Sequence, residues 1–320
     1  MEQRKLIKLG NSSFAIALPK DWIKKTGLQK GDAVFLQVDS AGNMSVNAEY
    51  KKTNNGKTKI LNFSNLQDPK AMEREISMAY LQDYSKIEIG GIKEKREFVK
   101  NIAKNLTGLE IVESTDEKII LKDFFDLNEV DLKDFVRRAD NIIRSMFEDL
   151  EEGFEKEGFE QKDCNEIYNA DRDLNKIYLL MNRLFVKSGS NPAVLSALNT
   201  TVIKMFNNWW LAYNLEHIGD ELKRIAKIIA NEKMKKEELA PVSKVLAAIK
   251  ENYVTVLSSY YKNDDIMSFK AISERDRLMK LADSLAFDSD SAIAKTGEKL
   301  KAILSFIHQI NKILVYESEK

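Results

Sequence analysis

Apolar residues recur at helical spacing through most of the chain, beginning near Asp131. From Leu132 to Leu150 they step by threes, fours and ones, the pattern of a helix packed on one side. Capping and breaking residues mark the starts of the helices that follow. Further helices are predicted at about 164–187, from Asn191-Pro192 to Asn231, from Pro241 to Tyr261, from Asp264-Asp265 to Ala286 and from Asp290-Ser291 to Tyr316. Three helices followed by three helices predict an antiparallel bundle of two repeats, 131–231 and 237–317, within residues 128–320.

The pattern changes before this bundle. Residues 58–127 alternate short apolar strands with two amphipathic helices and end in a hairpin, which predicts a small α/β domain of order β-α-β-α-β-β. Gly90-Gly91 follows a strand, but neither G-x-G-x-x-G nor G-x-x-x-x-G-K occurs. We therefore expect a linker or regulatory domain without chemistry of its own.

The first 57 residues show strands and turns. Strands are predicted at 4–9 and 14–18, a short helix follows Pro19, and a hairpin is centred on Ala41-Gly42-Asn43. Four short strands in fewer than about 50 residues can hardly bury a core alone. This unit is expected to complete itself by pairing with a second chain.

Charge distinguishes the two ends of the chain. The whole sequence balances 50 Lys and Arg against 50 Asp and Glu. Residues 1–57 hold ten basic and five acidic side chains, a net of +5, so the remainder carries −5. The balance excludes a uniformly basic nucleic-acid binder but leaves a basic N-terminal end. Residues 148–166 are acidic and could mimic nucleic acid, cradle basic hairpins of a partner chain, or form a solvated loop.

Residue counts also narrow the chemistry. Cys164 is the only cysteine, which excludes an intrachain disulfide and a multi-thiolate metal site. His217 and His308 are the only histidines, and they lie far apart in the sequence. This disfavours a catalytic triad and a metal site built from histidines. The N-terminal stretch lacks an apolar segment and no window of about 18 apolar residues occurs. We expect no signal peptide or membrane span and a cytoplasmic location.

One constellation offers oxygen ligands. Glu216 and Asp220 lie four residues apart on one helix face with Gly219 between them, and Asp171 and Asn175 repeat that spacing on the preceding helix. If the two helices pack antiparallel, the pairs can face one another and share a cation such as Mg²⁺, Mn²⁺ or iron, and glycine allows close approach. The alternative is a solvated face on which Lys223 and Arg224 neutralise the acids.

The second repeat departs from this pattern. Asp276 aligns with Asp171, but Lys280 replaces the polar partner, and Leu304 and His308 take the places of the Glu-x-x-x-Asp pair. We predict one metal-competent repeat and one degenerate repeat, with His308 structural.

The N-terminal run RKLIKLGNSSFAIALPKDWIKKTGLQKGDAVFL resembles the swapped-hairpin domains of the AbrB and MazE class, with Gly10, Ser12, Pro19, Gly27 and Gly31-Asp32 in order. The resemblance implies a barrel made by two interlaced chains whose basic face contacts double-stranded DNA. The phosphate-contacting residues would then be Arg4, Lys5, Lys8, Lys20, Lys24 and Lys25. A dimerisation clip with a solvated basic face is the alternative.

The helical stretch 131–317 resembles the PhoU family, on the residues LEHIGDELKRIA and DRDLN. The resemblance implies a dimeric regulator of phosphate uptake and phosphate-responsive signalling that contacts phosphate transporter or signalling proteins. It also implies a metal site (Mg, Mn, Fe or Zn) on the first repeat, formed by Glu216, Asp220, Asp171 and Asn175. A hairpin domain joined to such a bundle is similar to archaeal phosphate-uptake regulators.

The expected fold is therefore multidomain and mainly α, with a β hairpin barrel (1–57), an α/β domain (58–127) and a six-helix bundle (128–320). Two other functions remain open. A metal-dependent helix-bundle enzyme lacks Glu-x-x-His pairs, a nucleophile and a phosphate-binding loop. An antitoxin-like repressor usually follows its hairpin with a short flexible tail rather than a bundle. Trp209 and Trp210 are expected to pack between helices, with docking of a partner as the alternative.

Overall fold

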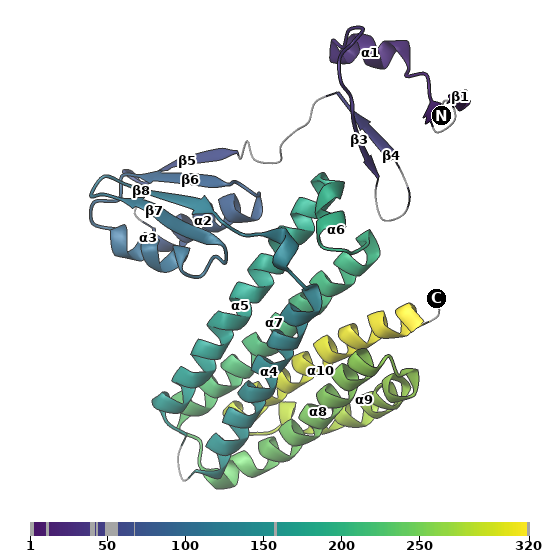
Figure 1. Ribbon diagram of the computed structural model, residues 1–320. Helices are drawn as coiled ribbons and strands as arrows, with labels where there is room; N and C mark the ends of the chain where they lie inside the picture. The colour runs from purple at the N-terminus through teal and green to yellow at the C-terminus, as the bar shows by residue number, and fades with distance from the viewer. Residues whose placement is uncertain are drawn as a thin grey trace. The chain divides into compact units, whose positions relative to one another are not determined.

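The computed structural model describes residues 3–10, 13–38, 42, 44–48, 57–66, 68–156 and 159–318 (Figure 1). The chain divides into two compact units, 1–56 and 57–320. Each unit is described by itself below.

The first unit contains two hairpins and a short helix. Strand β1 (Ile7–Leu9) pairs antiparallel with β2 (Ser13–Ala15), and β3 (Phe35–Val38) pairs with β4 (Met44–Asn47), with α1 (Lys20–Thr26) between the hairpins. Helix α1 ends at Gly27, whose φ of 74° is the left-handed conformation that glycine adopts without strain. The residues described here form two separate two-stranded sheets and no closed barrel. The predicted barrel requires two interlaced chains, so it stays a prediction.

No described side chain of the first unit is buried. Many of its large apolar side chains are exposed, between 39% for Phe35 and 69% for Leu6, while Leu18, Trp22 and Ile23 are half-buried. A folded unit that leaves strands of apolar side chains in water has not completed its core. The tips of both predicted turns, at residues 11–12 and at 39–41 and 43, lie outside the described residues, as do residues 49–56.

The second unit begins with a four-stranded sheet. Its elements are β5 (Thr58–Asn62), α2 (Pro69–Leu81), β6 (Lys86–Gly90), α3 (Arg96–Ala103), β7 (Leu109–Ser114) and β8 (Lys118–Asp123). The predicted β-α-β-α-β-β order is confirmed. The strand order is β5-β6-β8-β7, with β5 parallel to β6 and the other pairs antiparallel.

The strand register places the apolar positions of this sheet on one face. Leu61 is opposite Ile89, Ile89 is opposite Ile119 and Ile87 is opposite Leu121, and all are buried with side chains of α2 and α3. On the other face Ile60 is 72% exposed. The two helices therefore cover one side of the sheet only (Figure 1).

The helical bundle follows. Its helices are α4 (Leu132–Glu155), α5 (Gln161–Ser190), α6 (Pro192–Ala197), α7 (Val202–Glu232), α8 (Lys236–Lys262), α9 (Asp265–Ala286) and α10 (Ser291–Ser318). Helices α4, α5 and α7 pack together, as do α8, α9 and α10, and the two groups meet through α7 against α10 and α4 against α8 (Figure 1). One apolar core runs through both groups. Within the described chain, no helix has the length and apolar character needed to span a membrane.

Two predicted helix boundaries are wrong. The helix predicted from Asn191 to Asn231 is divided into α6 and α7, because Asn199 takes a positive φ of 45° and the Thr201 hydroxyl caps a new start by accepting from the Lys204 amide. Helix α8 begins at Lys236, not at Pro241, which lies inside it. The Glu238 carboxylate accepts the Lys235 amide at 2.7 Å and fixes this earlier start.

Buried ion pairs join the α/β part to the bundle. The Arg183 side chain on α5 is only 2% exposed, and its Nη2 lies 3.0 Å from Asp83 Oδ1 and 2.5 Å from Asp123 Oδ2. Its guanidinium also stacks 4.7 Å above the Tyr80 ring. Because Asp83 lies two residues after the end of α2 and Asp123 ends β8, this one side chain fixes the sheet against α5.

Candidate functional site

Helices α5 and α7 position the predicted carboxylates. Contacts pair Asp171 with Lys223, Tyr178 with Tyr213 and Phe185 with Phe206. Residue numbers rise along α5 as they fall along α7, so the helices are antiparallel, as the shared-site argument required. An ideal Cβ on Gly219 would lie 2.5 Å from Leu174 Cδ2. Glycine at this position therefore allows the close approach predicted from the sequence.

An ammonium group lies between two of the carboxylates. The Lys223 Nζ donates to Asp171 Oδ2 at 2.8 Å and to Asp220 Oδ1 at 2.5 Å. Arg224 adds a second contact, with Nη2 3.1 Å from Asp220 Oδ2. Burial acts to lower the pKa of Lys223, but its hydrogen bonds to both carboxylates outweigh burial and raise it. The cluster thus contains its own cations.

Glu216 lies beside this ion pair without sharing it. Burial, followed by the negative charge of Asp220, raises the pKa of the Glu216 carboxyl to about 7. Its Oε2 is 2.9 Å from Nδ1 of His217, which also lies 2.8 Å from the Tyr213 carbonyl oxygen. Burial likewise raises the pKa of Asp171, and it outweighs the effect of Lys223. Lys223 and Arg224 therefore neutralise only part of the negative charge of these three half-buried carboxylates.

In the observed arrangement, Lys223 lies among the residues predicted to bind a metal. Among the described residues, no group of three or more His, Cys, Asp or Glu side chains is placed to hold a metal ion. The physical reason is on α7, where Lys223 takes the position between Asp171 and Asp220 that a shared cation would need. Asn175 is half-buried one turn along α5 from Asp171. Metal binding by this set stays a prediction.

The corresponding place in the second repeat differs. Asp276 is exposed, with Arg275 Nη1 3.3 Å away, and Lys280 is exposed. Leu304 is buried, and burial together with the charge of Arg275 lowers the pKa of His308. A buried leucine and a half-buried histidine offer no carboxylate pair, so the asymmetry between the repeats follows from the side chains themselves.

An aromatic surface begins next to the carboxylates. It consists of Phe185 on α5 and Phe206, Trp209, Trp210 and Tyr213 on α7. Phe185 stacks on Trp209 at 4.8 Å between ring centroids, and Trp210 stacks on Tyr213 at 5.6 Å. Both tryptophans are half-buried. Trp209 packs against Phe185 of α5, as expected, while the ring contacts of Trp210 are with aromatic residues of its own helix.

Exposed aliphatic side chains lie close to these aromatic residues along the same two helices. Val202 is 66% exposed, Ile203 56% and Val186 46%, and Phe206 within the surface is 41% exposed. The sequence signal was the spacing of Phe206, Trp210 and Tyr213 along one face of α7. Periodicity alone could not show that this face lies outside the core. Apolar side chains gathered on a surface are typical of protein contacts.

The six predicted DNA-contacting residues are all exposed. Arg4 and Lys5 precede β1, Lys8 lies on β1, and Lys20, Lys24 and Lys25 lie on α1. Asp21 is the acidic residue in the first turn of α1. Exposure makes these side chains available to phosphates, but by itself it does not distinguish a DNA contact from a solvated face.

The acidic run 148–166 is partly neutralised by α8. Lys250 Nζ lies 2.7 Å from Glu151 Oε2, and Lys236 Nζ lies 3.0 Å from Glu155 Oε2. Residues 157 and 158 lie outside the described residues. The ion pairs favour a solvated helix end.

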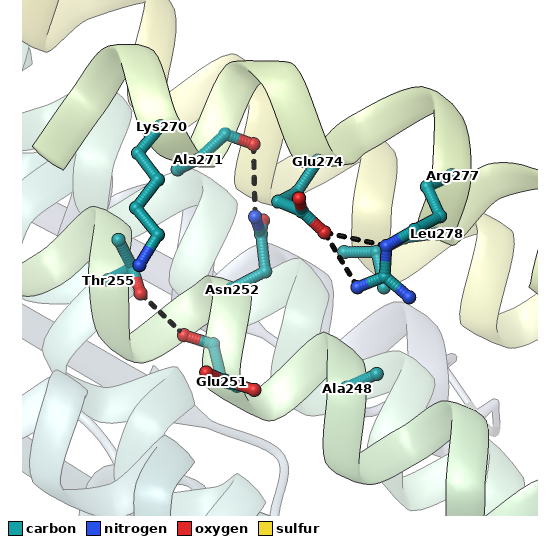
Figure 2. Close-up of a pocket in the computed structure, with 9 residues that line it drawn as sticks. All are labelled: Ala248, Glu251, Asn252, Thr255, Lys270, Ala271, Glu274, Arg277 and Leu278. Atoms are coloured by element: carbon teal, nitrogen blue, oxygen red, sulfur yellow. Dashed lines mark hydrogen bonds and ion pairs between the residues drawn. The ribbon is translucent and has the colours of Figure 1, made fainter.

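A charged cavity of about 240 Å³ lies between α8 and α9 (Figure 2). Glu274 and Arg277 pair within it, with Arg277 Nη2 2.6 Å from Glu274 Oε2, and the Asn252 amide donates to the Ala271 carbonyl oxygen. The cavity involves neither α5 nor α7. Because its Arg277 guanidinium is already paired, we assign it no ligand.

Comparison with known proteins identifies one domain. Residues 136–229 match the model of the PhoU domain, a stretch that runs from the first turns of α4 to the last turn of α7. The match covers less than a third of the chain and shows that its first helical repeat is similar to the PhoU domain. No curated protein and no solved structure matches the chain. These comparisons do not support the resemblance of residues 1–57 to the AbrB and MazE class. They also do not support the similarity to archaeal phosphate-uptake regulators.

Proposed function

We propose that this protein is a regulator of phosphate uptake that acts through protein contacts. The observation that carries the proposal is the PhoU domain at residues 136–229. Proteins with this domain are generally regulators and not enzymes. Its partners are phosphate transporter or signalling proteins, which it meets in the cytoplasm.

The aromatic surface supports this mode of action. Stacked rings on two packed helices are held in place before binding, so little side-chain entropy is lost when a partner docks. Aromatic side chains also dominate the binding energy of many interfaces. The matched domain includes Phe185, Phe206 and Tyr213, which places this surface within the segment that the family model recognises.

The first unit serves dimerisation and DNA contact in this proposal. Its exposed apolar strands support completion by a second copy of the chain, and its six exposed basic side chains support contact with duplex phosphates. DNA binding would connect phosphate status to transcription.

Phosphate uptake tests the regulatory proposal. Uptake of radiolabelled phosphate is measured in cells that lack the gene and carry wild type, Phe206→Asp or Ile266→Asp. Wild type should restore low uptake in phosphate-rich medium, whereas Phe206→Asp should leave it high. Ile266 is the control, because it is 82% exposed on α9 and away from the aromatic surface. If all three proteins restore low phosphate uptake equally, the aromatic surface is not a docking site for the partner. If deletion of the gene leaves uptake unchanged, the protein does not regulate phosphate uptake.

DNA contact is tested separately by gel retardation with the full chain. Each phosphate contact contributes about 0.9 to the slope of log affinity against log salt. Lys24→Gln with Lys25→Gln should therefore reduce the slope by about 2, while Lys262→Gln at the end of α8 should leave it unchanged. Absence of any retardation at low salt would reject DNA binding and leave the regulatory proposal intact.

A further inference from the structure

The carboxylate cluster of α5 and α7 is defined here as Asp171, Glu216 and Asp220. Lys223 lies one turn after Asp220, so the helix itself delivers an ammonium group to the cluster. Its Nζ reaches a carboxylate on each helix, at 2.8 Å on α5 and 2.5 Å on α7. The side chains of Lys223, Asp171 and Asp220 are 29%, 14% and 26% exposed. This is a half-buried ion pair between two helices.

Lys223 and a metal ion require the same oxygens. Divalent metals bind carboxylate oxygens at about 2.0–2.6 Å. A metal that bridges the facing sides of Asp171 and Asp220 would meet the two oxygens that already accept from Lys223. An ammonium bonded to both Asp171 and Asp220 prevents such bridging, and a divalent ion brought beside it meets positive charge at short range. Arg224 on Asp220 adds to the same repulsion.

We propose that Lys223 is the resident cation of the carboxylate cluster and that it excludes divalent metals from the first helical repeat. The lysine holds α5 against α7, the task that a bridging metal would otherwise perform. The inference rests on the ion-pair geometry and not on the proposed regulatory function, so either can fail without the other.

Removing the ammonium should convert the cluster into a metal site. In Lys223→Gln, the three carboxylates remain, and the two that Lys223 held lose their shared cation. Hard oxygen donors of this kind suit Mn²⁺. The amide of glutamine carries no charge and can be displaced without leaving an unpaired ion.

The experiment measures Mn²⁺ binding to the full chain after removal of metals by chelation. Binding is followed by the loss of the electron paramagnetic resonance signal of free Mn²⁺. The variants are Lys223→Gln, Lys223→Arg and, as a matched control, Lys227→Gln, whose lysine is exposed one turn further along α7. Wild type, Lys223→Arg and Lys227→Gln should bind only weakly. Lys223→Gln should bind about one Mn²⁺ at least 10-fold more tightly and show a rise in melting temperature on adding the metal.

A second substitution tests whether the tighter Mn²⁺ binding depends on Asp171. Asp171→Asn introduced into Lys223→Gln should abolish the tighter binding. The proposal is overturned if wild type binds stoichiometric Mn²⁺ at micromolar concentration, a measurement that requires no variant. It is also overturned if folded Lys223→Gln binds no better than wild type, with folding checked by circular dichroism.

Discussion

Glu216→Gln offers a direct test of the carboxylate cluster. The wild-type carboxyl has an ordinary pKa of 4.5 that burial and Asp220 raise to about 7. An acid whose pKa is higher in the folded state binds its proton more tightly there, so it destabilises the fold once it ionises. The penalty is absent below about pH 4.5, grows as pH rises to about 7, and is complete above that. Glutamine does not ionise and has no such dependence.

The magnitude follows from the shift. One pKa unit corresponds to about 1.36 kcal/mol, so a shift of about 2.5 units corresponds to roughly 3 kcal/mol. The Glu216 side chain is 17% exposed, so solvent screens this penalty only in part. The free energy of unfolding of Glu216→Gln, relative to wild type, should rise by roughly 3 kcal/mol between pH 4.5 and pH 8.

Urea unfolding followed by circular dichroism at several pH values measures this difference. Asp173→Asn is the control, because Asp173 is nearly half exposed on α5 and pairs with Lys176. The difference for Glu216→Gln is compared with the difference for this variant at each pH. The reasoning is refuted if the Glu216→Gln difference changes by less than about 1 kcal/mol over the range.

Three further predictions concern packing and buried charge, each measured by urea unfolding. Arg183→Met leaves Asp123 without its buried partner, whereas Asp83 keeps Lys187, and the change should cost about 3–5 kcal/mol. A cost below about 1 kcal/mol would contradict the role of Arg183 in joining the α/β part to α5. Gly297→Ala should destabilise the fold more than Gly219→Ala. The added Cβ at position 297 meets the backbone of α9 at 2.4 Å, whereas at position 219 it meets the flexible end of a leucine side chain. A larger loss of stability in Gly219→Ala would refute this argument. Asp140→Asn should cost roughly 1–3 kcal/mol, since this buried carboxylate accepts two tyrosine hydroxyls and an arginine, and a neutral result would show that those bonds add no net stability.

Local signals predicted much of the element order. The α/β part could be predicted because its strands are short apolar runs and Asp68-Pro69 marks a helix start, where the Asp68 carboxylate caps α2. The break between α6 and α7 was missed because Thr201 resembles any polar surface residue until its hydroxyl caps a helix. Pro241 was predicted to start α8, but the helix begins five residues earlier. The earlier start depends on the Glu238 carboxylate accepting the Lys235 amide, a contact that the sequence pattern does not show.

The candidate site was predictable in part. Spacing placed Glu216 and Asp220 on one face, and Gly219 indicated close approach. The sequence offered Lys223 as a cation that neutralises the acids, but it did not choose this over a shared metal, because a lysine three residues after an aspartate can equally extend into solvent. Only contact with Asp171, 52 positions earlier in the chain, decides its direction.

The sequence by itself determined which segments are helices and strands, which faces of them are apolar, and where oxygen-bearing and basic side chains occur, because periodicity, capping and charge are local properties. Only the tertiary structure decided that an ammonium occupies the carboxylate cluster, that the aromatic face of α7 lies at the surface, and that the first unit leaves its apolar strands exposed. Each of these depends on distances between residues far apart in the chain, which packing fixes and spacing along one element does not.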